Sequence, residues 1–198
     1  MPSGIQIGSG TKLSSVDKSF AEGGVKMTGD PFDFMVEGEG FFRVQKDDGT
    51  IAYTRDGHFQ KDKGGVLVTA DGFPVVPEIV VPANAKDFHV GIDGVVTVNV
   101  NGQTQELGQV QLADFINPAG LSSLGRNLYS ATRASGDPIV GAPAQNGLGR
   151  IAQMQLESSN VNMVEEMVNM ITGQRAYEIN SKVIQTGDQM LQTMNNMR

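Results

Sequence analysis

The feature that most constrains this chain is a heptad repeat of large apolar residues close to its C-terminus. Every seventh residue of the repeat is apolar, and the series runs Met163, Met170, Tyr177, Ile184 and Leu191. A period of seven is typical of a long helix that carries one apolar stripe. A helix over residues 162–194 would be about 50 Å long, and a helix of that length needs a partner to cover its stripe.

The residues around the repeat predict where the helix begins and how stable it is. Asn162 is a favourable N-cap, and Glu165 follows it at the spacing of a capping box. Glu165 and Glu166 also place negative charge in the first turn, where the helix dipole favours it. Gly173 and Gly187 lower the intrinsic helix propensity, so packing must supply much of the stability. Further apolar residues widen the stripe: Val164, Met167, Val168 and Ile171 in the first turns, and Ala176, Val183 and Met190 later.

The stripe could pack on the remainder of this chain or on other chains, and its pattern alone leaves both open. The helix is longer than a small β domain can cover, which favours a partner from another chain. Its other faces carry side-chain amides in place of the lysines and glutamates of a solvated helix. Amides form hydrogen bonds without the desolvation cost of a charge, which suits a helix surrounded by helices. These amides are Asn169, Gln174, Asn180, Gln185, Gln189, Gln192, Asn195 and Asn196.

Residues 31–151 predict an antiparallel β domain of short strands. Segments rich in β-branched and aromatic residues alternate with Asp-Gly and Asn-Gly turns, which join antiparallel neighbours. The predicted strands are residues 33–37, 41–45, 51–54, 58–60, 66–69, 73–76, 78–81, 88–90, 95–100, 110–116 and 127–129. The turns are Asp48-Gly49, Asp56-Gly57, Asp71-Gly72, Asp93-Gly94 and Asn101-Gly102.

The rest of the chain is divided by the same signals. Residues 1–30 are rich in glycine and serine and predict an extended arm. A weak helical turn is predicted near residues 118–124, a loop-rich connector at 132–150 and a last strand at 153–157. We therefore expect three parts: an arm over residues 1–30, a β domain over 31–151 and a C-terminal assembly helix within 152–198. The predicted fold class is mainly β, with antiparallel short strands and a coiled-coil-type helix.

Composition excludes several classes of function. The chain of 198 residues has a net charge of −7 and no basic run, which argues against a nucleic-acid partner. It has no cysteine, so disulfides, thiol nucleophiles and cysteine-ligated metals are excluded. No apolar run is long enough to span a membrane, and no secretory signal is visible. The loop-like sequence after Met1 suggests that the chain starts inside a longer protein.

Two short motifs superficially suggest ligand sites, and each has a simpler interpretation. Gly38 and Gly40 follow a strand as in a nucleotide loop, but no helix N-terminus comes next, so a hairpin is predicted. Asp47 and Asp48 before Gly49 lack the spacing of a calcium loop, so a turn is predicted.

Catalytic and metal-binding patterns are weak. Glu37 and Glu39 stand two apart, as paired carboxylates can, but nothing marks a cleft and a solvent-facing edge is favoured. His58 and His89 are far apart, and neither stands in a zinc motif. The segment 53–59, Tyr-Thr-Arg-Asp-Gly-His-Phe, could form a binding patch, although strand–turn–strand explains it equally. We therefore predict no enzyme, no cofactor and no metal.

Several blocks in order resemble one known family, the flagellar basal-body rod and hook proteins, and most closely its distal rod (FlgG-type) members. The resemblance covers nearly the whole chain. Its most specific part is residues 156–171, Leu-Glu-Ser-Ser-Asn-Val-Asn-Met-Val-Glu-Glu-Met-Val-Asn-Met-Ile. The other blocks are residues 31–42 with their Gly-Glu-Gly-Phe-Phe ending, and residues 53–59, 67–73, 115–121, 125–129, 174–182 and 188–191.

This resemblance implies a structural subunit that polymerises helically into the drive shaft between motor and hook. It implies partners among copies of itself, other rod proteins and the hook protein, with no nucleic acid and no membrane insertion. It implies location in the bacterial basal body, in the periplasm, after type III export without a cleaved signal peptide. Terminal helices of the family pair as a coiled coil lining the tube, and the β domain forms the outer layer.

The resemblance implies an N-terminal helical segment as the natural partner of the stripe, and we expect this segment to be absent from the chain. We expect the lone helix to pair with another copy or to be poorly ordered. The predicted assembly residues are Met163, Val164, Met167, Val168, Met170, Ile171, Tyr177, Ile184 and Leu191, with Glu165, Glu166 and Arg175 as register-setting charges. Alternatives are a proximal rod or hook subunit, or a cell-wall glycan-binding β module on an oligomerising stalk.

Overall fold

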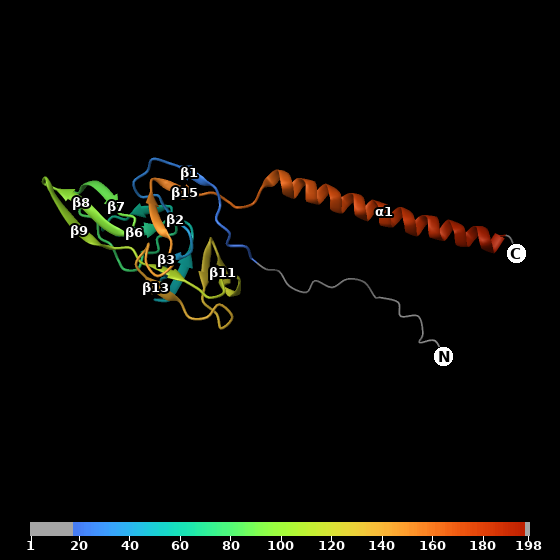
Figure 1. Ribbon diagram of the computed structural model, residues 1–198, viewed down its shortest axis with the longest axis horizontal. Coiled ribbons are helices and arrows are strands. Elements are labelled where there is room, and N and C mark those ends of the chain that lie inside the picture. The colour runs from blue at the N-terminus through green and yellow to red at the C-terminus, as the bar shows by residue number, and fades with distance from the viewer. Residues whose placement is uncertain (1–17, 197–198) are drawn as a thin grey trace. The chain divides into compact units, whose positions relative to one another are not determined.

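The computed structural model describes residues 18–196, whose contacts divide after Ser158 into two compact units (Figure 1). The first unit holds the strands of the described chain, and the second, from Ser159, holds the helix α1 (Met163–Asn196). The predicted fold class, mainly antiparallel β with one long C-terminal helix, is confirmed. Residues 1–17 of the predicted arm lie outside the described residues.

The largest sheet has six antiparallel strands in the order β11–β12–β4–β3–β10–β13. They are β3 (Phe41–Gln45), β4 (Ile51–Thr54), β10 (Leu112–Asp114), β11 (Ser122–Gly125), β12 (Leu128–Ser130) and β13 (Ile139–Gly141). Strands β3 and β4 form the predicted hairpin at Asp48-Gly49, with Val44 opposite Ala52. Strand β10 pairs with the other edge of β3, where Leu112 lies opposite Phe42.

Four smaller sheets complete the first unit. A three-stranded sheet consists of β7 (Lys86–Val90), β8 (Val95–Val100) and β9 (Gln103–Gln109). The pairs are β2 (Phe34–Glu37) with β14 (Arg150–Gln153), β5 (Phe59–Lys61) with β6 (Leu67–Thr69), and β1 (Val25–Met27) with β15 (Gln155–Glu157). The β8–β9 turn has Asn101 at φ 54° and Gly102 at φ 84°, as expected for an Asn-Gly hairpin turn.

The core of the first unit lies on both faces of the six-stranded sheet. Phe41 and Phe42 are neighbours in β3, so their side chains point to opposite faces. Phe42 joins a large cluster with Phe34, Phe59 and residues from every smaller sheet except β1–β15. Phe41 joins a second cluster, whose other buried members are Tyr53, Ala113, Phe115 and Leu121. Burial on two faces explains the apolar run at this strand.

Several strands of the first unit were not predicted because their sequences are polar or short. Strand β9 reads Gln-Thr-Gln-Glu-Leu-Gly-Gln, and β11 and β13 lie in segments predicted as a helical turn and a connector. Strand β14 begins at Arg150, where the predicted connector ends. The predicted helical turn is a 3₁₀ turn, η1 (Pro118–Gly120), directly before β11. The predicted strands at 73–76 and 78–81 contribute isolated bridges only, such as Val75 with Val44 and Val80 with Val66.

The predicted hairpin at Gly38 and Gly40 is wrong. Strand β2 pairs with β14, whereas β3 pairs with β4 and β10, so this turn connects two different sheets. The two glycines have φ of 103° and 133°, backbone conformations that residues other than glycine rarely adopt. Gly149 donates from its backbone N–H to the carbonyl of Glu39 at 2.7 Å, which holds the turn against the start of β14.

The helix α1 begins as predicted. Its N-cap is Asn162, whose side-chain oxygen accepts a hydrogen bond from the backbone N–H of Val164 at 3.0 Å. Glu165 and Glu166 lie in the first turn, where the macrodipole favours their charge. The last strand predicted over residues 153–157 is only partly confirmed: Gln155–Glu157 form β15 of the first unit, whereas Gln153 ends β14 and Met154, at φ 63°, lies between the two strands.

Candidate functional site

The predicted assembly residues all lie on α1, and none of the apolar ones is buried. Their exposed fractions range from 50 % for Ile171 to 78 % for Tyr177. The heptad series Met163, Met170, Tyr177, Ile184 and Leu191 follows one line along the helix, with the slight drift of a straight α-helix. Large apolar side chains in such a line are typical of a packing seam, and a solvated helix gains nothing from them.

The charged residues next to the stripe form no ion pair within the described chain. Glu165, Glu166 and Arg175 take part in none of the ion pairs among residues 18–196. Their proposed role in setting register therefore stays a prediction. Three threonine hydroxyls of the helix instead bond back to the carbonyl four residues earlier, at Thr172, Thr186 and Thr193.

The two glycines of α1 lie beside the stripe and leave gaps in it. Gly173 follows Met170 by three residues, and Gly187 follows Ile184 by three, so each shares a face with its large neighbour. A Cβ added at either glycine meets no atom within 4 Å. Large side chains therefore alternate with open backbone along the same seam, an arrangement that lets the backbone of a second helix approach closely.

A second feature of interest lies where the chain leaves the first unit. Strands β1 and β15 pair antiparallel, with Val25 opposite Glu157 and Met27 opposite Gln155. The backbone N–H of Ser158 donates to the carbonyl of Gly24 at 2.7 Å. The segment before β1 and the segment after β15 are therefore held side by side at the boundary of the unit.

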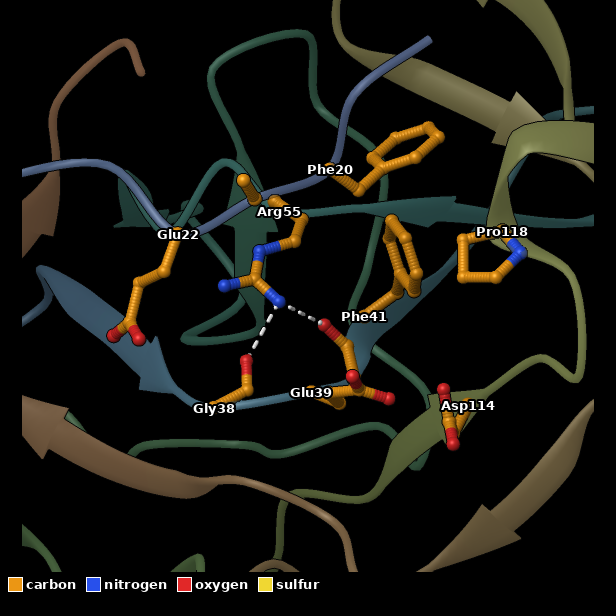
Figure 2. A pocket seen from close by; sticks show the side chains of 10 residues that line it. Phe20, Glu22, Gly38, Glu39, Phe41, Arg55, Asp114 and Pro118 are labelled. Carbon is orange, nitrogen blue, oxygen red and sulfur yellow. Dashed lines mark hydrogen bonds between the residues drawn. The ribbon is translucent and has the colours of Figure 1, made fainter. Parts of the chain in front are cut away.

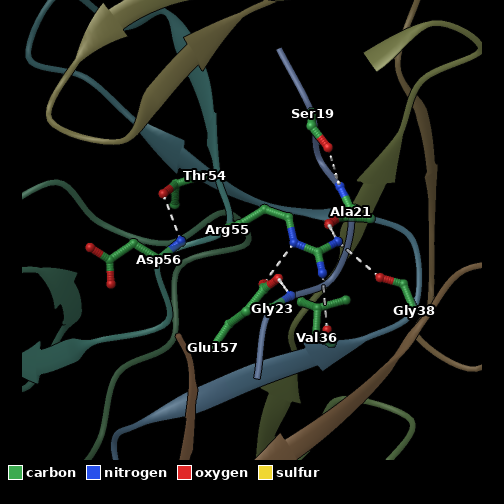
Figure 3. Close-up of polar contacts among 10 residues, drawn as sticks. Ser19, Ala21, Gly23, Val36, Gly38, Thr54, Arg55, Asp56 and Glu157 are labelled. Atoms are coloured by element: carbon green, nitrogen blue, oxygen red, sulfur yellow. Dashed lines mark hydrogen bonds and ion pairs between the residues drawn. The ribbon is translucent and has the colours of Figure 1, made fainter. Parts of the chain in front are cut away.

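Arg55 is the centre of this junction (Figure 3). Its Nε donates to Oε2 of Glu157 at 2.9 Å, and the two side chains are each only 15 % exposed. Its terminal nitrogens donate to three backbone carbonyls, those of Gly38 at 2.9 Å, Gly40 at 3.0 Å and Val36 at 3.2 Å. The other carboxylate oxygen of Glu157 accepts a hydrogen bond from the backbone N–H of Gly23 at 2.9 Å.

A cavity of about 230 Å³ adjoins Arg55 (Figure 2). Its apolar lining comes from Phe20, Phe41 and Pro118, and the ring of Phe20 packs edge-on against Phe41 at 5.3 Å between centroids. Three carboxylates, of Glu22, Glu39 and Asp114, also line it. No group of three metal-ligating side chains with the spacing of a metal site is found in residues 18–196.

Of the residues weighed for catalysis, Glu37, His58 and His89 form structural contacts in the described chain, and Glu39 lines the cavity beside Arg55. Glu37 pairs with Arg150 across β2 and β14. Nδ1 of His58 lies 2.7 Å from Oδ1 of buried Asp33, and His89 contacts Gln153 in a different sheet. These carboxylates and histidines are not brought together in one cleft.

Two side chains of the β3–β4 hairpin have shifted pKa values with structural causes. Hydrogen bonds from the side chain and backbone of Thr50, and then from Lys46, lower the pKa of Asp48 to about 2. This carboxylate closes a turn, as predicted for Asp47-Asp48-Gly49. Burial raises the pKa of the Tyr53 phenol, which packs in the second core cluster.

Of the two side chains at the junction, Arg55 lies in a segment that the sequence marks as a candidate site, and Glu157 does not. The segment 53–59 was considered as a binding patch, and its arginine is the central donor of the junction. No local sequence pattern marks Glu157 as a member of the junction, because its partner Arg55 is 102 residues away.

A helix long and apolar enough to cross a membrane is not found in the described residues.

Comparison with known proteins gives consistent results over the whole chain. The family model described as flagellar hook protein FlgE/F/G D1 domain matches residues 35–98, and flagellar basal body rod FlgEFG protein C-terminal matches residues 152–197. The chain is 50 % identical to flagellar basal-body rod protein FlgG of Buchnera aphidicola subsp. Schizaphis graminum, covering 100 % of this chain and 76 % of the relative. The same protein of Buchnera aphidicola subsp. Acyrthosiphon pisum is 51 % identical with the same coverage. Flagellar hook protein FlgE of Escherichia coli is 42 % identical over 59 % of this chain and 29 % of its own length.

Proposed function

This chain belongs to the FlgG family of flagellar basal-body rod proteins and is a structural subunit of the distal rod, and we propose that α1 is its assembly element. The observation that carries this proposal is the exposed heptad stripe of the helix. Copies that pack through such stripes by head-to-tail contacts form an open helical filament. A shaft of this kind transmits torque through many repeats of the same contact.

We propose that the two units occupy different layers of the rod. We propose that α1 belongs to an inner layer of packed helices. The first unit, called the β unit from here on, contains the predicted β domain of residues 31–151 and would form the outer layer. The exposed stripe supports an inner position, since contacts with neighbouring helices would cover it. Glu165, Glu166 and Arg175 are the charges that we expect to set the register between neighbouring helices.

Partners and location extend this proposal. Copies of the chain, other rod proteins and the hook protein are the expected partners, and the rod of the basal body is the location. We propose that the subunit reaches the periplasm through the flagellar type III export apparatus without a cleaved signal peptide. A hook subunit is the weaker alternative, because the hook relative aligns with only 59 % of this chain.

The proposal is tested by placing a charge in the middle of the stripe. Tyr177→Asp in the full-length protein should abolish rod and hook assembly, because a carboxylate buried among apolar side chains is costly without a partner. Counting rods and hooks in isolated basal bodies by electron microscopy measures the effect. The β unit should remain folded, with the far-UV circular dichroism of its strands unchanged.

Thr172→Asp is the matched control, since it adds the same charge to the same helix at a residue that belongs neither to the stripe nor to the amides of the other faces. This variant should assemble normally. Normal assembly and motility with Tyr177→Asp would contradict the role of the stripe.

A further inference from the structure

The proposed function requires that force pass between α1 and the β unit, and the chain makes this connection through β15 and residues 158–162. We propose that Arg55 is the anchor that ties this connection to the β core, through the carboxylate of Glu157. The proposal rests on the function above, because a subunit that transmits torque needs such an anchor. Arg55 is thus a positioning residue for the exit of the chain from the β unit.

The ribbon of β1 and β15 is weak without an anchor. Each strand has three residues, and all three residues of β1 are exposed, with Met27 at 80 %. A two-stranded ribbon is marginally stable in water unless it packs on something else. Neither strand contributes to the two buried core clusters of the β unit. The ribbon therefore depends on contacts at its two ends. Backbone hydrogen bonds of Met154 with Asp33 and Thr28 hold one end, and the side chain of Glu157 holds the end from which the chain leaves.

Arg55 supplies such a contact to two separate parts of the molecule at once. One edge of its guanidinium binds Glu157 of the ribbon at 2.9 Å. The terminal nitrogens bind the carbonyls at the end of β2 and in the Gly38–Gly40 turn, at 2.9 to 3.2 Å. Strand β2 lies in the large core cluster through Phe34 and Val36. The arginine thus connects the exit segment to the most deeply buried part of the unit.

The geometry requires arginine in particular. A guanidinium has five N–H donors in a fixed plane, whereas the ammonium of lysine is a compact charge that cannot reach four acceptors spread over β15, β2 and the Gly38–Gly40 turn. The unusual φ values of Gly38 and Gly40 place the carbonyls of these two residues, which flank Glu39, within reach of a single nitrogen of Arg55. The ring of Phe41, 6.0 Å from the guanidinium carbon, covers one side of the group.

The shielding of this pair distinguishes it from the other arginine–carboxylate pairs of the described chain. Both side chains of the Arg55–Glu157 pair are 15 % exposed, while Arg150 is 63 % and Arg126 is 76 % exposed in their pairs. Exposed pairs contribute little because water and salt screen them. A shielded pair with further hydrogen bonds leaves an unmatched charge when one partner is removed.

The first test measures the anchor in the purified chain, without any need for a rod. In Arg55→Met, the backbone amides of Gly23 and Ser158 should exchange with deuterium about 10-fold faster or more, the effect expected when a hydrogen bond to a charged group is lost. Amides of β3 and β4 should keep their protection. Glu157→Gln, which retains size but not charge, should give a smaller acceleration at the same amides.

Arg150→Met is the control, because it removes an exposed pair that lies outside the ribbon. It should leave the exchange of Gly23 and Ser158 unchanged. Unchanged exchange in both Arg55→Met and Glu157→Gln would overturn the anchor, whatever the chain does in the cell. Glu157→Gln keeps the test decisive if Arg55→Met does not fold.

The second test measures load in cells that make the full-length protein. Strains with Arg55→Met should build rods and hooks in normal number but lose swimming as the viscosity of the medium rises, and Arg55→Lys should be intermediate. If Arg55→Met swims like the wild type in viscous medium despite fast exchange at the ribbon, the proposed role of Arg55 in transmitting force is overturned. Failure of the unaltered protein to restore rods in a strain lacking it would instead refute the proposed function.

Discussion

At the scale of single residues, the positions that matter most in the β unit are those where backbones or polar groups meet at close range. Gly57 belongs to a predicted Asp-Gly turn, but its surroundings demand glycine for another reason. A Cβ at this position would lie 1.6 Å from the carbonyl oxygen of Phe34. The backbone N–H of Phe34 in turn donates to the carbonyl of Gly57 at 3.0 Å, so the two segments cross in direct backbone contact.

Gly57→Ala should therefore be among the most damaging single-methyl changes in the β unit. We expect a loss of about 3 kcal/mol in the free energy of unfolding, at the upper end of overpacking effects, because the contacted atom is backbone and cannot rotate away. Urea unfolding followed by circular dichroism measures it, since the chain has no tryptophan.

Gly49→Ala provides the comparison for this glycine. Gly49 has φ of 79° and open space around its Cβ position, so only the left-handed backbone penalty of about 1 to 2 kcal/mol applies. Equal losses for the two variants would show that Gly57 is a turn residue and that the close crossing with Phe34 is unimportant.

At the scale of elements, α1 combines a strong apolar stripe with weak intrinsic helix formation. The stripe has no buried residue in the described chain, and Gly173 and Gly187 interrupt it where a partner backbone could approach. Natural helices seldom place glycine on a packing face unless close approach is useful, since glycine costs about 1 kcal/mol relative to alanine. Replacing either glycine with alanine should therefore stabilise the lone helix but reduce the assembly of subunits into rods.

Gly187→Ala tests this opposition directly. The variant should increase the helix content of the isolated chain, seen in far-UV circular dichroism, because alanine favours the helix by about 1 kcal/mol. The same variant of the full-length protein should form fewer rods, because the added methyl group fills the gap beside Ile184. Lys182→Ala, at a residue outside the stripe and outside the amides of the other faces, is the control and should change neither property. Increased or unchanged rod formation with Gly187→Ala would show that no backbone approaches the helix there.

At the scale of the whole molecule, the described chain consists of a folded β unit and a helix whose apolar stripe is exposed. Both core clusters, including their partly buried neighbours, lie within residues 18–158. The β unit is therefore expected to fold without the helix. Exposed apolar side chains in a continuous line favour association as concentration rises.

Light scattering across a range of concentrations checks this expectation. The chain should show a mass that rises with concentration, and a version ending at Ser158 should remain a monomer with its strands intact. A constant monomeric mass for both would mean that α1 does not associate with copies of itself and that a different helix covers its stripe in the rod. Association of the shortened version would move the contact from the helix to the β unit.

The amino-acid sequence is sufficient to predict those elements that depend on residues close to one another in the chain. The heptad period, the N-cap Asn162 and the Asp48-Gly49 and Asn101-Gly102 turns depend on neighbours within a few residues, so pattern and propensity predict them. The long helix and the antiparallel class of the sheets were predicted for this reason. The family resemblance rests on such local blocks as well.

Only the tertiary structure decided which strands pair and what holds the exit of the chain. The polar segment β9 forms a strand because it pairs with the edge of β8, and its own residues do not predict a strand. The glycines at 38 and 40 look like a hairpin in sequence, yet their strands belong to different sheets. Arg55 and Glu157 meet across 102 residues, and a contact of that range leaves no periodic signal, because its free energy depends on where the folded backbone places both ends.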